Sequence, residues 1–314
     1  MDPRLKRPDS SSPTEIMKMK HIFLVFMVAA VNGPLFLLCE SITINLSGAA
    51  SAAVKAGGRP SGAQKQQVFD LLKTFETHAA APRNVINPNK YIQHNLNVAD
   101  GKTAFADMTS GPTDGSKVNT VRVFQDQDLV FTHSYYLDGP SGKETAGFDI
   151  FRFEKGQIVE HWDNRQDLAE KNPSGRTMLD GPTAVADLTL TKANKDLVRG
   201  MMQNILVDGA LDNIGVYFNC LNYLQHDPAL GDGLLPFYRQ MALAAVDGSM
   251  KYTKISRIMG EGNFVLVVSE GEQGGQLAAY YDLFRVDKGK IAEHWNTMEI
   301  IPDSSEWKNT NGKF

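Results

Sequence analysis

The sequence predicts an α+β protein of two tandem cone-shaped α+β barrels, each a curved antiparallel sheet with helices closing a pocket. The first observation is a repeat, because Phe148–Gln166 returns as Tyr281–Glu299 with 9 of 19 positions identical and no gap. The second is order, since helix-like periodicity precedes strand-like runs in each half. The third is the spacing of about 132 residues between the copies, which is far above solenoid length. Each half is therefore expected to have its own core.

Residues 1–60 differ from the rest of the 314-residue chain. Basic residues precede the apolar run Ile22–Val31, and a small-residue Ala-Ser-Ala site follows at Ala50–Ala52. These are the parts of a secretory signal peptide, while the apolar run is short for a spanning helix. We expect a signal peptide or disordered N-terminus and a secreted or periplasmic protein. The alternative is a chain anchored to a membrane by this segment.

The first half is expected at residues 61–180. Val68, Leu71, Leu72 and Phe75 follow the spacing of an amphipathic helix, and a shorter helix is expected near Thr103–Met108. Alternating, β-branched and aromatic runs then predict four strands. These runs are Val118–Phe124, Leu129–Leu137, Glu144–Phe153 and Gln157–Gln166.

The second half, residues 181–314, repeats this order. Leu197, Val198, Met201 and Ile205 form a helical stripe, and a second helix is expected over Leu234–Ala245. Four strands are expected near Met250–Met259, Phe264–Glu270, Gln276–Val286 and Ile291–Met298. The polar tail Pro302–Phe314 is expected to be loose, unless Trp307 holds it to the surface.

Composition excludes several functions. A formal net charge of −4 gives no basic footprint, which argues against nucleic-acid binding. The sequence has no phosphate-binding loop, no Gly-x-Ser-x-Gly elbow and no short histidine spacing of a metal site. We therefore expect neither a metal nor a cofactor.

Three motifs carry a resemblance to a known family. The segment YIQHN at Tyr91–Asn95, the strand VFTHS and the hairpin FDIFRFEKGQIVEHWD resemble the SnoaL-like polyketide cyclase branch of the nuclear-transport-factor-2-like superfamily. The resemblance covers residues 63–300 as two tandem copies. It implies cone-shaped barrels, and its relatives include cyclases, isomerases and non-enzymatic binding domains. Members often pair through the outer sheet face, which implies an intrachain pseudo-dimer of the two halves and a possible homo-oligomer.

Acid/base catalysis in an apolar cavity is the chemistry that this resemblance implies. Removing a proton next to a carbonyl needs a base near the working pH and a donor for the developing enolate. Desolvation moves the pKa of a histidine or carboxylate toward neutrality. The candidate catalytic residues are His94, His133, Asp149 and His161. The candidate ligand-binding residues are Tyr91, Trp162, Asp163, His226, Asp282 and His294.

Each candidate also has a structural interpretation. The histidines could fix turns or lie satisfied in the core, and Asp149 and Asp282 could pair with nearby arginines. Strand alternation leaves open whether Glu160 or His161 faces the interior.

The two halves are not equivalent, because Val268 replaces His133 and Asn296 replaces Asp163. We therefore expect any active pocket in the first half. The expected function is a cofactor-free cyclisation, isomerisation or related proton transfer on a small apolar carbonyl compound. The alternative is a non-catalytic ligand-binding or interaction module.

Overall fold

The computed structural model describes residues 60–220 and 222–314. The expected signal peptide lies outside these residues. Within them, no helix has both the length and the apolar character needed to cross a membrane.

The first half begins with α3 (Ala63–Leu72), α4 (Thr74–Thr77) and the 3-10 turn η1 (Ala81–Val85). The short strand β1 (Ile92–Gln93) and helix α5 (Lys102–Met108) follow. The strands are β2 (Lys117–Asp126), β3 (Leu129–Leu137), β4 (Glu144–Glu154) and β5 (Gln157–Asp167). They form a sheet in the order β1-β5-β4-β3-β2, in which β1 is parallel to β5. The sheet is therefore mixed and not wholly antiparallel.

The second half has the same order of elements. It contains η2 (Leu188–Leu190), α6 (Thr191–Met201), the π-helix η3 (Met202–Val207), η4 (Leu211–Asn213), α7 (Ile214–Tyr217), β6 (Leu224–Gln225) and α8 (Leu234–Asp247). Strands β7 (Met250–Glu261), β8 (Phe264–Gln273), β9 (Gln276–Asp287) and β10 (Lys290–Ile300) complete a sheet ordered β6-β10-β9-β8-β7, and η5 (Ser304–Glu306) follows. The α+β prediction is confirmed.

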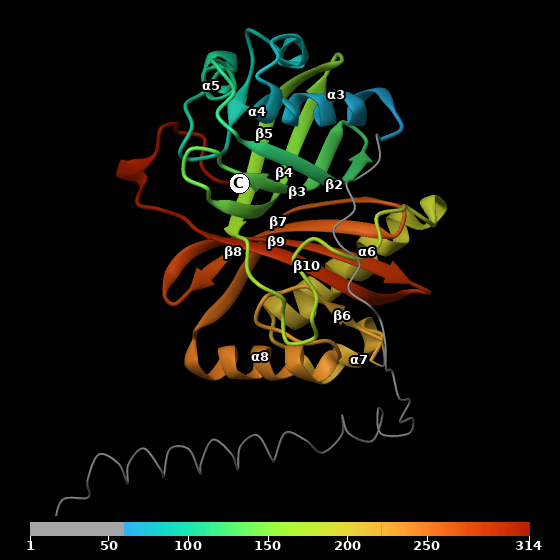
Figure 1. Cartoon of the computed structure of the whole chain (residues 1–314). Helices are drawn as coiled ribbons and strands as arrows, with labels where there is room; N and C mark the ends of the chain where they lie inside the picture. The colour runs from blue at the N-terminus through green and yellow to red at the C-terminus, as the bar shows by residue number, and fades with distance from the viewer. Residues whose placement is uncertain (1–59, 221) are drawn as a thin grey trace, which may run out of the picture. The chain divides into compact units, whose positions relative to one another are not determined.

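Each sheet carries helices on one face. In Figure 1, α3, α4 and α5 cover the first sheet, whereas α6, α7 and α8 lie on the far side of the second. The first core joins both layers: Val68, Leu71 and Leu72 of α3 pack with Phe105 of α5 and with Phe151 of β4. The apolar spacing of α3 is thus explained by burial of one helix face against the sheet.

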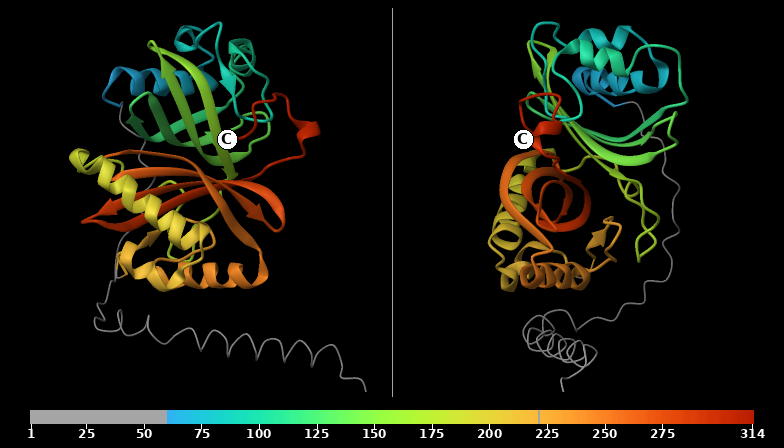
Figure 2. Two further views of the ribbon diagram at one scale, coloured as in Figure 1. Left: turned by 180° about the vertical axis from the view of Figure 1, so that it is seen from behind. Right: turned by 90° about the vertical axis from the view of Figure 1, so that its left-hand side faces the viewer.

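The opposite faces of the two sheets lie against each other in Figure 2. Their buried side chains form one hydrophobic cluster. The first sheet contributes Phe124, Phe131, Phe148, Ile150 and Trp162, and the second contributes Met259, Phe264, Leu266, Val268, Ala279, Tyr281, Leu283 and Trp295. Both faces of each sheet are therefore covered, which explains why the strands are apolar on both sides. The alternation that marks a half-exposed strand is lost for this reason.

The repeated hairpin forms as predicted, but β5 contains a bulge. Lys155 and Gly156 occupy positive φ values of 51° and 81°, as the tight turn between β4 and β5 requires. On β5, Glu160 pairs with Arg152 but Ile158 pairs with Phe153, so one extra residue lies between them. Because of this bulge, Ile158 belongs to the helix-covered core, and His161, three residues later, faces the same side.

Candidate functional site

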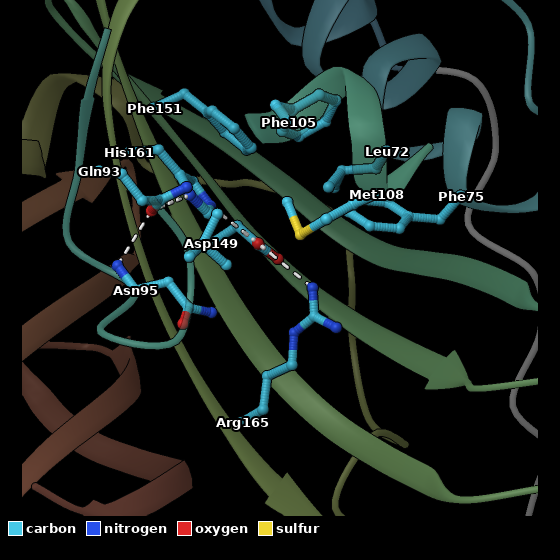
Figure 3. Close-up of a pocket in the computed structure, with 11 residues that line it drawn as sticks. Leu72, Phe75, Gln93, Asn95, Phe105, Met108, Asp149, Phe151, His161 and Arg165 are labelled. Atoms are coloured by element: carbon cyan, nitrogen blue, oxygen red, sulfur yellow. Dashed lines mark hydrogen bonds and ion pairs between the residues drawn. The ribbon is translucent and has the colours of Figure 1, made fainter. Parts of the chain in front are cut away.

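A small cavity lies between the helices and the sheet of the first half. Its volume is about 100 Å³. Side chains from α3, α4, α5, β4, β5 and the segment after β1 surround it, as Figure 3 shows. The lining residues are Leu72, Phe75, Gln93, Asn95, Val98, Phe105, Met108, Asp149, Phe151, His161 and Arg165. The wall is mostly apolar, and its ionisable groups all come from β4 and β5.

His161 and Asp149 form a buried pair at the sheet side of this cavity (Figure 3). Nε2 of His161 lies 3.1 Å from Oδ1 of Asp149, and Nδ1 lies 2.9 Å from Oε1 of Gln93. The same Gln93 oxygen accepts the backbone N–H of Asn95, which fixes the orientation of the amide. Nδ1 of His161 must therefore donate to Gln93, and Nε2 shares a proton with the carboxyl group of Asp149.

Two further groups set the charge of Asp149. Burial raises the pKa of Asp149, but the hydrogen bond from His161 and the Arg165 charge outweigh burial and hold this pKa below its usual value. The hydroxyl of Tyr136 also donates to Asp149. Asp149 is therefore a carboxylate at neutral pH, and the expected shift of its pKa toward neutrality by desolvation is not found.

Arg165 supplies a cation at the edge of the pair. Its guanidinium lies 3.9 Å from Oδ1 of Asp149 and 3.7 Å from the centre of the Tyr136 ring. The contact with the aromatic face adds a cation–π attraction to the ion pair, and the two interactions together hold the guanidinium in place. It can stabilise negative charge that develops on a ligand in the cavity.

The atoms of Asp149, His161 and Asp163 that could ligate a metal ion lie within 4.8 Å of one another, which is close enough to consider a metal site. Two cations already face this group, because Arg165 lies 3.9 Å from Asp149 and Nζ of Lys313 lies 3.9 Å from Oδ1 of Asp163. Both nitrogens of His161 are also engaged. These charges fit proton transfer better than they fit metal ligation.

The second half keeps the pair but not the cation. His294 lies 2.9 Å from Asp282 and 3.0 Å from Gln225, and the hydroxyl of Tyr252 lies 3.3 Å from the same carboxylate. Met298 occupies the position that matches Arg165. Tyr252 also lines a more open cavity of about 290 Å³ beside η3 and α8.

Two of the four candidate catalytic residues lie on the other face of the first sheet. His133 is buried between the sheets, where Nδ1 lies 3.1 Å from the Arg122 guanidinium and the ring stacks on Phe148. Burial and the Arg122 charge lower the pKa of His133 well below its usual value. His94 lies 3.0 Å from Glu160 and stacks on Trp162 at 4.7 Å. His94, His133 and Asp149 therefore do not line one cavity, because strand alternation points His133 away from Asp149.

Three candidate ligand-binding residues of the first half have different surroundings. Trp162 stacks on the ring of His94, and the guanidinium of Arg257 lies 3.9 Å from the centre of the Trp162 ring. Tyr91 packs in the core against Phe105. Asp163 accepts a hydrogen bond of 2.6 Å from Asn95.

His226 lies outside the pocket of its own half as well. Nε2 lies 2.9 Å from Glu293 and Nδ1 lies 2.7 Å from Asp180. Burial lowers the pKa of His226, but Asp180 and Glu293 outweigh burial and raise it. This histidine is a buried cation between two carboxylates.

Sequence reasoning missed Gln93, Tyr136 and Arg165. Gln93 lies within the repeated motif that includes His94, so its recurrence as Gln225 was a usable signal. Arg165 is replaced by Met298, which was a visible difference between the aligned hairpins. For Tyr136 there was no such signal, because its counterpart Tyr252 is on a different strand.

The chain therefore has two α+β halves, of which the first combines a small apolar cavity with a proton-sharing pair and a cation. No protein-family model matches the chain, and no curated protein matches it significantly. Among solved structures, it is similar to a SnoaL-like polyketide cyclase from Agrobacterium tumefaciens, at 11% identity over 34% of this chain and 91% of that one, with a TM-score of 0.29.

Two further likenesses are to NTF2-like proteins of unknown function. One, from Mesorhizobium loti, is 17% identical over 34% of this chain and 97% of that one, with a TM-score of 0.28. The other, from Cytophaga hutchinsonii, is 17% identical over 38% of this chain and 95% of that one, with a TM-score of 0.29. At these low scores, the chain's own residues must support any function.

Proposed function

We propose that the first half is a cofactor-free acid/base site for a small apolar carbonyl compound. The observation that carries the proposal is the contact of 3.1 Å between Asp149 and His161 at the wall of an apolar cavity. Asp149 is the base, His161 orients it through their hydrogen bond, and Arg165 stabilises the oxyanion.

The reaction begins with proton abstraction. The Asp149 carboxylate takes a proton from the carbon next to the carbonyl, and the electron pair of that bond moves to the carbonyl oxygen. Arg165 faces the resulting enolate and stabilises its charge. In a β,γ-unsaturated ketone, return of the proton from Asp149 to the γ-carbon isomerises the compound. In a dicarbonyl compound, attack of the enolate on the second carbonyl closes a ring, and Asp149 returns its proton to the new alkoxide.

The cavity volume limits the substrate. A cavity of about 100 Å³ is smaller than the cavity of about 150 Å³ that admits benzene in a well-studied protein core. A polycyclic compound does not fit without movement of α5, whereas a short ketone does. The proposal therefore favours small carbonyl compounds over extended polyketides.

Non-catalytic binding is the second candidate. The observation that favours it is that His161 and Asp149 are fully hydrogen-bonded within the chain. A pair whose hydrogen bonds are all made within the chain can have a purely structural role. The cavity would then bind a ligand without chemistry.

Butan-2-one in D₂O separates the two candidates, because removal of its α-protons appears as deuterium uptake by NMR. We expect saturable uptake above the buffer rate, and a loss of about 100-fold or more in Asp149→Asn. Asp282→Asn is the matched control in the second half and should keep the rate. Saturable binding without deuterium uptake would support the binding module, and the absence of both would exclude this site for small ketones.

A further inference from the structure

Two segments leave the sheets and cross to the other half. The linker arm, residues 168–182, follows β5, and the tail arm, residues 301–314, follows β10. In Figures 1 and 2, the red tail runs from the second half to the first, where the C-terminus lies. The prediction of a loose tail is wrong, because its polar side chains are hydrogen-bonded.

The tail arm holds the segment after β1 in place. Asn311 donates to the backbone oxygen of Gln93 at 2.9 Å and to Asp100 at 2.7 Å. Asn309 donates to the backbone oxygens of Asn95 and Val98 at 2.8 and 2.9 Å. Gln93 of β1 and Asn95 and Val98 of this segment line the cavity wall.

The linker arm makes the matching contacts in the second half. Asn172 donates to the backbone oxygen of Gln225 at 2.6 Å, and Arg176 donates to Asp232 at 2.8 Å. Asp100 and Asp232 are equivalent, because each accepts the backbone N–H of the matching glutamine, Gln93 or Gln225. The two arms thus exchange places across the pair of halves.

In each half, one histidine donates a hydrogen bond to a backbone oxygen of an arm. Nδ1 of His94 donates to the backbone oxygen of Gly312 in the tail arm at 2.8 Å. Nδ1 of His226 donates to the backbone oxygen of Thr177 in the linker arm at 2.8 Å. Both histidines lie outside the cavities, and holding an arm is the role that the geometry gives them.

The arm matters for the site because β1 is only two residues long. One edge of β1 pairs with β5, and the other would leave the Gln93 carbonyl without a donor if Asn311 were absent. The side chain of Gln93 in turn fixes Nδ1 of His161. A chain of contacts therefore runs from the tail through Gln93 to the proton-sharing pair.

We propose that each half completes the proton-sharing site of the other through these exchanged arms, so that the two halves work as an internal pseudo-dimer. Asn309 and Asn311 are positioning residues for the first-half site, and Asn172 is the positioning residue for the second. The catalytic consequence rests on the proposed function, but the positioning itself does not.

Exchange of imidazole N–H protons with water, measured by NMR on ¹⁵N-labelled full-length protein, tests this directly. In Asn311→Ala, we expect the Nδ1–H of His161 to exchange about tenfold faster or more, while that of His294 is unchanged. In the matched control, Asn172→Ala, the effect should be reversed. His161→Gln and His294→Gln assign the two signals.

Two results would overturn the proposal. One is an unchanged His161 signal in Asn311→Ala, and the other is equal acceleration of His161 in both variants, which would reveal only a global loss of stability. If Asn311→Ala does not fold, Asn309→Ala removes the neighbouring contacts and is held to the same outcomes. A wild-type protein that is inactive on butan-2-one leaves this measurement intact, so failure of the proposed function is distinguishable.

Discussion

One hydrogen bond is conserved between the halves with its partners exchanged. In the first half, Asn95 donates to Asp163 at 2.6 Å, and in the second half Asn296 donates to Asp227 at 2.8 Å. Asn95 corresponds to Asp227, and Asp163 corresponds to Asn296. We predict that Asn95→Asp is destabilising alone and is rescued by Asp163→Asn.

The expected magnitudes follow from the geometry. Asn95→Asp removes a hydrogen bond to a charged group, worth about 1.5–3 kcal/mol, and places two carboxylates in contact. At an effective dielectric of about 20, two charges about 4 Å apart repel by about 4 kcal/mol, although protonation of one relieves part of this. Asp163→Asn alone leaves two amides that still pair, at a cost of about 1 kcal/mol. The double variant should be within about 1 kcal/mol of the wild type, since the bond is re-formed in reverse.

Urea unfolding of the wild type, both single variants and the double variant at pH 7 gives the coupling free energy. We expect a favourable coupling of about 2 kcal/mol or more. The reciprocal exchange in the second half, Asp227→Asn with Asn296→Asp, is the matched control and should couple similarly. Additive single effects would refute the reasoning, and Asp163 would then remain a candidate for binding a ligand.

Two further predictions concern the buried cations between the sheets. Because the pKa of His226 is raised, its stabilising contribution is complete below the unfolded value of about 6.5 and is lost as pH rises through the folded value. The urea midpoint should therefore fall over this range, and His226→Gln should flatten the fall; an unchanged profile would contradict the assignment. Arg122 donates to the backbone oxygens of Leu179, Asp180 and Pro182, so Arg122→Met should lose about 3 kcal/mol or more in urea unfolding. Arg257→Met, at the matching position, should lose less, and equal losses would contradict this reasoning.

The elements of the fold could be predicted because they depend on local pattern. The Lys-Gly turn and the apolar runs around it specify the hairpin of β4 and β5 wherever the rest of the chain lies. The helical stripe at Val68, Leu71 and Leu72 likewise specifies one buried face of α3.

The face of β5 on which His161 lies could not be predicted, because it depends on a bulge. Strict alternation from Ile158 places His161 on the opposite face, and the extra residue between Ile158 and Glu160 restores it to the cavity. The order of the tail could not be predicted either. Its partners, Gln93 and Asn95, lie more than 200 residues away, and nothing in the local composition of the tail reveals them.

Each of the two buried carboxylates accepts a hydrogen bond from a tyrosine hydroxyl. A comparison of the two halves indicates whether the fold or a reaction requires this bond. In the first half this phenol is Tyr136 on β3. In the second half the matching position on β8 is Gly271, where an added Cβ would lie 2.1 Å from the Lys251 backbone oxygen. Tyr252, on the neighbouring strand β7, supplies the phenol instead. Two routes to the same contact indicate that a buried aspartate needs this donor in any case.

The same reasoning applies to the histidine and glutamine, which both halves keep. The proton-sharing pair alone therefore does not distinguish an active half from a structural one. Arg165 does, because no burial requirement preserves a cation at that position and Met298 replaces it in the second half. The proposed chemistry depends on this difference more than on the pair that first indicated it.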